Sequence, residues 1–263
     1  MNGFKKYFKN RISEVIALLQ RPKRKYRPDT FHQLRVGIKK LDALFELIEF
    51  CTEDFNRDKF FKPMEEIFQQ AGKVRDLQIE RSLMKRHFFL NRLKSYRREL
   101  RKKQQHAKDD FFHAKDKSLI SKIKKSHAEV APFLKAISRN KVKRFLDEKR
   151  NEIKELLTNL DLQHEQGHEL RKILKTYYYV VTNPNLKGKF KNSSKDKLSP
   201  VLGKWHDYDM MLTHLEKVIK ANQDTPKNAK RFEKIKNRIT VKGNLWLAKA
   251  NKIGPSTEFL KSS

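Results

Sequence analysis

Histidine, arginine and lysine recur at a fixed spacing at two places in this chain. The pattern His-x-Leu-Arg-x-x-x-Lys begins once at His32 and again at His168. A helix advances about 100° per residue, so offsets of three and seven residues put the three basic side chains within roughly 60° of one another. Arginine offers a planar fork for phosphate oxygens, lysine a mobile charge, and histidine a donor that can titrate near neutrality. Each copy therefore predicts a basic stripe suited to phosphate.

A second, shorter pattern follows each copy. Gly72 opens Gly-Lys-Val-Arg-Asp, 40 residues after His32, and Gly203 opens Gly-Lys-Trp-His-Asp, 35 residues after His168. Two ordered matches about 130 residues apart indicate an internal repeat. Because glycine inside a helix costs about 1 kcal/mol relative to alanine, we expect close helix packing, or the approach of a ligand, at each glycine. The aspartate that ends each pattern is expected to orient a neighbouring basic side chain rather than to contact an anion.

The elements that must position these residues are predicted to be helices. The chain has only 8 glycines and 8 prolines in 263 residues. Its apolar residues recur mainly at three- and four-residue spacings, with no convincing alternating strand. The expected helices cover about 4–20, 30–50, 57–86 and 88–113 in the first half, and 134–160, 166–182, 195–221 and 227–251 in the second.

Each basic stripe is expected to point away from the core. In the helical projection, the apolar residues around His32 and around His168 fall on a different face from the basic side chains. The repeat therefore preserves geometry as well as residue types. The predicted core residues are Leu34, Ile38, Leu41, Phe45 and Ile48 in the first copy, and Leu170, Leu174, Tyr177 and Val181 in the second.

The charge of the chain points to an anionic partner. Its 62 lysines and arginines face only 31 acidic residues, which gives a formal net charge of +31. Self-repulsion on this scale destabilises a compact state unless a polyanion offsets it. The alternative is a solvated, lysine-rich surface that serves solubility alone. A solvated surface has no need to keep histidine and arginine at fixed offsets twice, so we favour binding.

The remaining composition excludes several classes of protein. The single cysteine, Cys51, rules out an intrachain disulfide framework and is expected to be a small core residue. The first 20 residues lack the pattern of a secretory signal, and no stretch approaches the roughly 18 consecutive apolar residues of a membrane span. We therefore expect a soluble, cytoplasmic protein without membrane contact.

Taken together, the paired motifs resemble those of the CHAD family, the conserved-histidine α-helical domain, over about residues 4–251. The resemblance implies an all-α fold of two four-helix bundles, related by internal duplication and a pseudo-twofold axis. It further implies a basic central cavity that binds inorganic polyphosphate. Within this one domain, the expected parts are a first half at 1–114, a helical or flexible linker at 115–133, a second half at 134–252 and a tail at 253–263.

The resemblance also implies which residues bind polyphosphate. They are the basic residues of the two stripes, a neighbouring lysine in each, and one basic residue from each glycine pattern. The family commonly has a further arginine ten residues after each motif histidine, where this chain has Asp42 and Tyr178. Lys40 and Lys172 could partly compensate for these two departures. The candidate residues are His32, Arg35, Lys39, Lys40, Arg75, His168, Arg171, Lys172, Lys175 and His206.

Nucleic-acid binding is the main alternative function, because any basic groove attracts phosphodiester backbones through counterion release. Single-strand binders usually place aromatic residues among the basic ones for base stacking. Here Phe45, Phe68 and Tyr177 fall at core-like spacings, and Trp205 and Trp246 are expected to be packed. Enzymatic turnover of phosphate would need metal-holding carboxylates or an activated nucleophile, and the basic faces contain few acids. We therefore expect a non-catalytic polyphosphate binder, with weaker nucleic-acid binding as the alternative.

A different chemistry is suggested by the segment from His164 to His168, which reads His-Glu-x-x-His. Two histidines one helical turn apart can hold a zinc ion. However, no third ligand follows closely, since the next glutamate after Glu169 is Glu216. The position that corresponds to His164 in the first copy is Pro28, so His164 is not part of the repeat. We therefore expect neither a metal nor any other cofactor.

Overall fold

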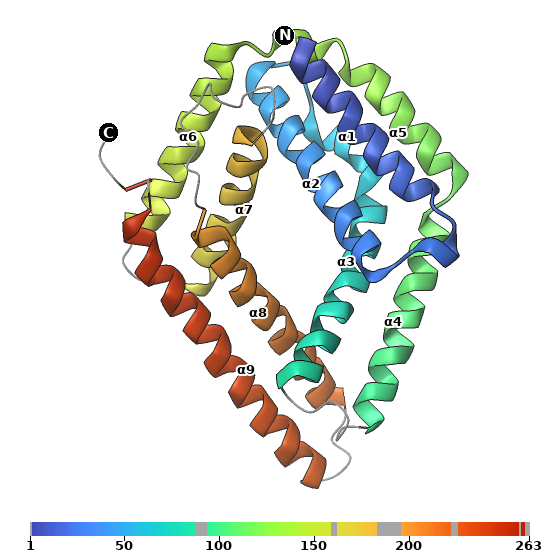
Figure 1. The fold of residues 1–263 in the computed structure, drawn as a ribbon, viewed down its shortest axis with the longest axis vertical. Coiled ribbons are helices and arrows are strands. Elements are labelled where there is room, and N and C mark those ends of the chain that lie inside the picture. Colours follow the sequence, from blue (N-terminus) through green and yellow to red (C-terminus); the bar gives the residue numbers. More distant parts are fainter. Residues whose placement is uncertain are drawn as a thin grey trace. The chain divides into compact units, whose positions relative to one another are not determined.

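The fold is entirely helical in the part of the chain that the computed structural model describes, residues 2–87, 94–158, 162–182, 196–221, 226–257 and 259–260. This confirms the predicted all-α class. None of these helices combines the length and apolarity that crossing a bilayer would require. The α-helices, shown in Figure 1, are α1 (Asn2–Gln20), α2 (Pro28–Cys51), α3 (Arg57–His87), α4 (Lys94–Ala114), α5 (Lys117–Val130), α6 (Arg139–Thr158), α7 (His164–Val181), α8 (Leu198–Ala221) and α9 (Pro226–Ile253).

Each helix predicted from the sequence is present, and its ends lie within a few residues of the prediction. The helix predicted at 30–50 is α2, for example, and the one predicted at 166–182 is α7. The expected linker at 115–133 contains α5, so it is helical over most of its length. The helix predicted at 88–113 is α4, although residues 88–93 lie outside the described part of the chain.

The helices group into two compact units, and each unit draws on both halves of the sequence. Helices α3, α6 and α7 contribute residues to both units. The expected sequence parts, 1–114, 115–133, 134–252 and 253–263, stay predictions, as does the internal duplication. Unit 1 comprises Met1–Gln78, Ser95–Glu148 and Thr176–Asn192; unit 2 comprises Ile79–Lys94, Lys149–Lys175 and Ser193–Ser263.

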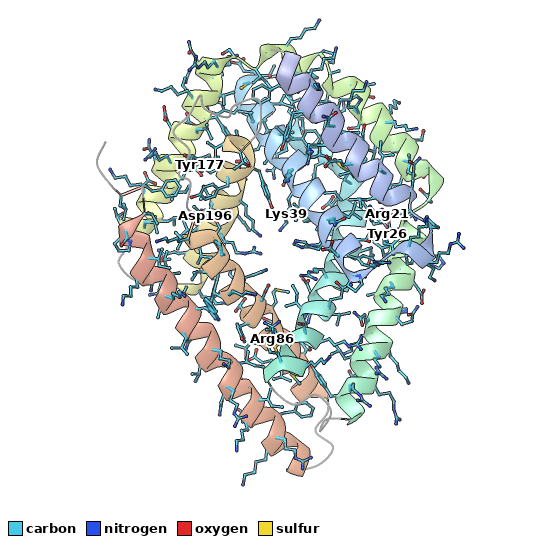
Figure 2. All side chains as sticks on the ribbon, in the orientation of Figure 1. Arg21, Tyr26, Lys39, Arg86, Tyr177 and Asp196 are labelled. Atoms are coloured by element: carbon cyan, nitrogen blue, oxygen red, sulfur yellow. The ribbon has the colours of Figure 1, made fainter. Side chains whose placement is uncertain are left out.

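Unit 1 is built around aromatic side chains. The rings of Tyr26, Phe31 and Phe111 lie 5.0 to 5.4 Å apart, centroid to centroid. The Tyr26 hydroxyl donates to the carbonyl of Leu18 at 2.6 Å, and burial raises its pKa well above the ordinary value, against the opposing charge of Arg21. Figure 2 shows Arg21 and Tyr26 beside each other. The predicted core residues of α2 are all buried: Leu34, Ile38, Leu41, Phe45 and Ile48.

Unit 2 is built on the packing of α8 against α9, which lie side by side (Figure 1). Its buried residues include Trp205, Tyr208 and Met211 from α8 and Phe232 and Ile239 from α9. The predicted core residues of α7 are also buried; Leu170 and Leu174 belong to unit 2, and Tyr177 and Val181 to unit 1.

Candidate functional site

The first motif is positioned by the start of α2. Pro28 occupies the first position of the helix, where the N–H that proline lacks would have no partner within the helix. The Thr30 hydroxyl accepts a hydrogen bond from the backbone N–H of Arg27 at 3.2 Å. These contacts fix where the helix begins. His32 follows in the second turn and is exposed, and Lys39 lies two turns further along.

The Arg35 guanidinium is held against α3. Its Nη1 donates to the backbone carbonyl of Phe68 at 3.0 Å, and its central carbon lies 4.5 Å from the centroid of the Phe68 ring. The ammonium nitrogen of Lys39, labelled in Figure 2, lies 5.7 Å from the same centroid. A cation over an aromatic face is stabilised by about 0.5–1 kcal/mol when exposed, and by more when desolvated. Phe68 therefore supports two of the three basic side chains of the first motif.

Gly72 leaves the space that Arg35 fills. It lies one helical turn after Phe68, and a Cβ atom at this position would overlap Nη1 of Arg35 and lie 3.2 Å from its Cζ. Any side chain at position 72 would therefore displace the guanidinium. The sequence predicted close packing or ligand approach at this glycine. The close contact is with an arginine side chain of the neighbouring helix α2.

The electrostatic surroundings of Arg35 include both signs of charge. Burial lowers the pKa of its guanidinium, the Asp76 carboxylate raises it, and the charge of Arg75 lowers it. Arginine nevertheless stays charged at neutral pH. Arg75 donates weakly to Gln78, with 3.4 Å between Nη1 and Oε1. Arg35 and Arg75 thus lie close together, and the Asp76 carboxylate is near enough to Arg35 to raise its pKa.

Lys40 and Asp42 have different surroundings from this stripe. The pKa of Lys40 is lowered by burial and by the charge of Arg11, with Glu14 opposing, so Lys40 lies near α1. Asp42 accepts from Nε and Nη2 of Arg57, both at 2.8 Å. Burial raises the pKa of Asp42, and Arg57 opposes that rise. At position 42, where the family commonly has an arginine, this chain has a carboxylate that pairs with Arg57 at the start of α3.

The second motif is positioned by the start of α7. The side-chain carbonyl of Gln166 accepts from the backbone N–H of Gln163 at 3.0 Å, as the third residue of a capping box does. This contact sets His164 in the first turn and His168 in the second. The start of α8 is set similarly, because Asp196, labelled in Figure 2, accepts from the backbone N–H of Ser199 at 2.9 Å.

His168 is half-buried between side chains of α8. Its Nε2 lies 3.1 Å from Oδ2 of Asp209, and its ring centroid lies 4.6 Å from that of Trp205 and 5.2 Å from that of His206. Burial lowers the pKa of His168, with Asp209 opposing and His164 acting in the same direction as burial. A lowered pKa keeps this imidazole neutral at pH 7, so it supplies a hydrogen bond rather than a charge.

The other candidates of the second motif differ in exposure. Lys172 is exposed, whereas Arg171, Lys175 and His206 are half-buried. Arg171 lies close enough to His168 for its charge to lower the pKa of the imidazole. Arg171, His168 and His206 therefore form a group within unit 2.

The glycine of the second half has different neighbours from Gly72. A Cβ atom at Gly203 would have no heavy atom of another element within 4 Å in the described structure. Ser199 stands one turn before Gly203, in the place that Phe68 has relative to Gly72. The position that corresponds to Phe68 is therefore not aromatic in the second half.

Two residues of these sites were missed from the sequence. Phe68 was assigned to the core, but its ring is only half-buried and faces two cations. The sequence feature that could have indicated these contacts is the position of Phe68, one turn before Gly72 on the same helical face. Asp209 was overlooked as a partner for His168. It lies one turn after Trp205, on the face of α8 that contacts α7.

Comparison with known families matches the chain to the CHAD domain over residues 7–216. The chain belongs to the CHAD domain family. Its fold also matches the crystal structure of the CHAD domain from the plant Ricinus communis, with a TM-score of 0.74 over 98% of this chain and 92% of that one. The two sequences are 14% identical, so the likeness shows a shared CHAD fold and nothing finer. No curated protein matches the chain.

Proposed function

We propose that this CHAD domain binds inorganic polyphosphate through the basic residues of α2 and α7, without chemical turnover. The proposal rests on the contacts that hold the Arg35 side chain in place. Its guanidinium is bonded to the Phe68 carbonyl, stacked on the Phe68 ring and accommodated by the missing side chain of Gly72. A charge that served only solubility would need none of these contacts. A charge that must meet an anion at a fixed place would need all of them.

The chemistry of Arg35 and Lys39 suits a chain of phosphates. A guanidinium carries five N–H donors in one plane, and the bond to Phe68 uses Nη1. Nε and Nη2 can together donate to two oxygens of one phosphate. Lys39 rests on the same ring and can neutralise the next phosphate as a mobile charge. Arg75 lies near enough to Arg35 to perturb its pKa, and we assign it a supporting role.

In unit 2 we assign the corresponding role to Arg171, Lys172 and Lys175, with His206 as a neutral or charged donor. His168 is held by Asp209 and Trp205, so its contribution is to fix the surface rather than to add charge. The net charge of +31 adds a long-range attraction that is independent of these contacts. Binding in the cytoplasm, to free polyphosphate or to granules, belongs to the same proposal.

Nucleic acid is the alternative polyanion, and the surroundings of Phe68 argue against it. Base stacking requires an exposed aromatic face beside the basic residues. The Phe68 ring is half-buried and already has the Arg35 guanidinium 4.5 Å from its centroid. At the first motif, nucleic acid should therefore bind through its backbone charge, and more weakly than polyphosphate.

The test is the double variant Arg35→Ala/Arg171→Ala, with long-chain polyphosphate titrated by calorimetry at several salt concentrations. A charge-assisted hydrogen bond is worth about 1.5–3 kcal/mol, so we expect affinity to fall roughly tenfold or more for each arginine. The slope of log K against log salt should become shallower by about 1.4, if each contact contributes about 0.7 as on single-stranded nucleic acids.

The matched control is Arg101→Ala/Arg238→Ala, which removes one exposed arginine from each unit and the same total charge. This control should lose less than threefold in affinity. Equal losses in the two double variants would mean that bulk charge, and not the motif, binds the polyanion.

A further inference from the structure

Three side chains with metal-ligating atoms converge within unit 2. Nε2 of His164 lies 2.5 Å from Oδ1 of Asp209, and Nε2 of His168 lies 3.1 Å from Oδ2 of the same carboxylate. The three ligand atoms lie within 4.8 Å of one another. The His164 side chain is 58% exposed, His168 27% and Asp209 15%. The group is thus accessible from solvent at one side and anchored at the other.

We propose that His164, His168 and Asp209 bind a divalent transition metal of the zinc class. Two histidines at positions i and i+4 lie on one face of α7, which is the arrangement that lets two imidazoles hold one ion. The sequence argument against zinc was that no third ligand follows closely along the chain. The third ligand comes instead from α8, a separate helix, so this argument no longer holds.

The ligand atoms, which lie within 4.8 Å of one another, must move closer together to hold one ion. Zinc binds histidine nitrogen at about 2.0–2.1 Å and carboxylate oxygen at about 2.0–2.2 Å, so neighbouring ligands of a tetrahedral site lie about 3.3 Å apart. Asp209 and His168 already satisfy this spacing within a few tenths of an ångström. Asp209 and His164 must separate by less than about 1 Å. His164 is the most exposed of the three and can make that movement by rotating its side chain.

The surrounding side chains hold the ligands in place. The Trp205 ring centroid lies 5.3 Å from that of His164 and 4.6 Å from that of His168, so one indole packs against both imidazoles. Gly167, between the two histidines, allows this approach, because a Cβ there would lie 3.0 Å from the Trp205 ring. Packing of this kind fixes ligand orientation before the metal arrives.

The three ligands leave a fourth position for another group. A pocket of about 320 Å³ adjoins the cluster, and its lining includes His164, Asp209, Tyr208 and Asn244. Zinc sites with three protein ligands keep an open position for water or a small anion. We infer that this position faces the pocket, where an oxygen-bearing anion could reach the ion.

The donor set also selects the class of metal. Imidazole nitrogen suits zinc, copper, iron and nickel, whereas magnesium and calcium prefer sites built of oxygen. The inference does not rest on polyphosphate binding. His168 is shared with that proposal, where it only fixes the surface, whereas His164 and Asp209 lie outside the residues proposed for that function. Either proposal can fail while the other holds.

The experiment uses full-length protein without a histidine tag, titrated with Zn²⁺ in calorimetry and with Co²⁺ in visible absorption. We expect one Zn²⁺ per chain, visible bands typical of four-coordinate Co²⁺, and no competition from millimolar Mg²⁺. His164→Ala and Asp209→Asn should each weaken Zn²⁺ binding by about 100-fold or more, since even partners behind the ligands are worth 10–100-fold. Asp209→Asn keeps the shape of the carboxylate, so it separates metal binding from packing.

Matched controls are His106→Ala, which removes an exposed histidine from α4, and Asp147→Asn, which removes an exposed aspartate from α6. Both should bind Zn²⁺ as the unaltered chain does. Thermal melting gives a second readout, because one equivalent of Zn²⁺ should raise the Tm of the unaltered protein and not that of His164→Ala. Weak binding of several ions, with equal losses in His164→Ala and His106→Ala, would overturn the proposal and leave a hydrogen-bonded cluster that only joins α7 to α8.

Discussion

The two copies of the His-x-Leu-Arg-x-x-x-Lys motif share their letters but are held in different ways. In the first copy the arginine is the fixed residue, stacked on Phe68 above Gly72, and His32 is exposed. In the second copy the histidine contacts Asp209 and Trp205. A repeated sequence pattern therefore determines which face of a helix a side chain occupies. The residues of the partner helix decide which contacts that side chain makes.

The difference originates in the glycine-bearing helices α3 and α8. Phe68 lies one turn before Gly72, whereas Ser199 lies one turn before Gly203. Six residues after each glycine, the first half has Gln78 and the second has Asp209. One helix thus offers an aromatic ring to a guanidinium, and the other offers a carboxylate to imidazoles. The first arrangement suits an anion-binding cation, and the second suits a metal.

Among the changes that compare the two motifs, the largest effect is expected from removing the aromatic support of Arg35. Phe68→Ala should weaken polyphosphate binding by about tenfold, because Arg35 and Lys39 lose the surface on which they rest. It should also lower the free energy of unfolding by about 2 kcal/mol, since the ring is half-buried and full burial is worth 3–5. Calorimetry and urea unfolding measure the two effects.

The matched change in the second half is Ser199→Ala. It should alter binding less than twofold and stability by less than about 0.5 kcal/mol. If both variants bind polyphosphate equally well, the two motifs do not differ in the way that their contacts suggest.

The two glycines provide the next comparison. Gly72→Ala should displace the Arg35 guanidinium and weaken polyphosphate binding by about fivefold. Its stability should stay nearly unchanged, because better helix propensity, about 1 kcal/mol, offsets the lost hydrogen bond to Phe68. Gly203→Ala meets open space, so it should gain about 1 kcal/mol of stability and leave binding unaltered. Circular dichroism and calorimetry on the two variants would check this; a loss of binding in Gly203→Ala would contradict it.

A smaller effect is expected at position 42, where the family commonly has arginine. Asp42→Arg would put a second guanidinium against Arg57 and should cost about 1 kcal/mol of stability. The exchange Asp42→Arg/Arg57→Asp restores the opposite charges and should recover most of that stability. Because the exchange leaves the net charge unchanged, polyphosphate affinity should change less than threefold. Urea unfolding of both variants measures the effect, and equal stability for the single and the exchanged variant would show that the pair contributes nothing.

The smallest expected effect concerns Cys51, at the end of α2. Burial raises the pKa of its thiol to about 11, against the opposing charge of Lys141. At pH 8 only about one thiol in a thousand is then ionised, so a disulfide reagent should label the native protein far more slowly than the unfolded chain. Labelling should accelerate as the pH rises toward 11. Polyphosphate bound along α2 should slow this labelling about twofold. If the native protein without polyphosphate is labelled as fast as a free thiol, α2 opens readily and the expectation is wrong.

Much of the fold followed from local pattern. The apolar spacing in α2 and α7 predicted both helices and their buried residues, because a helix of this kind has only one face that can pack. The helices predicted at 30–50 and 227–251 match α2 and α9 within two residues at each end. Such features depend on residues within a few turns of one another, so one sequence is enough to specify them.

The parts that could not be predicted depend on contacts between distant segments. The spacing of residue types along α2 does not indicate that the Arg35 side chain would fill the space beside Gly72. Nor does the His-Glu-x-x-His segment indicate that a carboxylate from another helix would reach both imidazoles. Asp209 had a local signal, its place one turn after Trp205, but that signal has meaning only once α7 is known to pack there.

The most direct test of polyphosphate binding is a competition between polyanions. Long-chain polyphosphate, single-stranded RNA and duplex DNA would be offered at the same phosphate concentration and the same salt, with a labelled polyphosphate as the reporter. We predict that unlabelled polyphosphate displaces the reporter at least tenfold more effectively than either nucleic acid. We further predict that Arg35→Ala/Arg171→Ala largely removes this preference. Displacement by RNA or DNA at equal or lower phosphate concentration would contradict polyphosphate as the ligand of this CHAD domain.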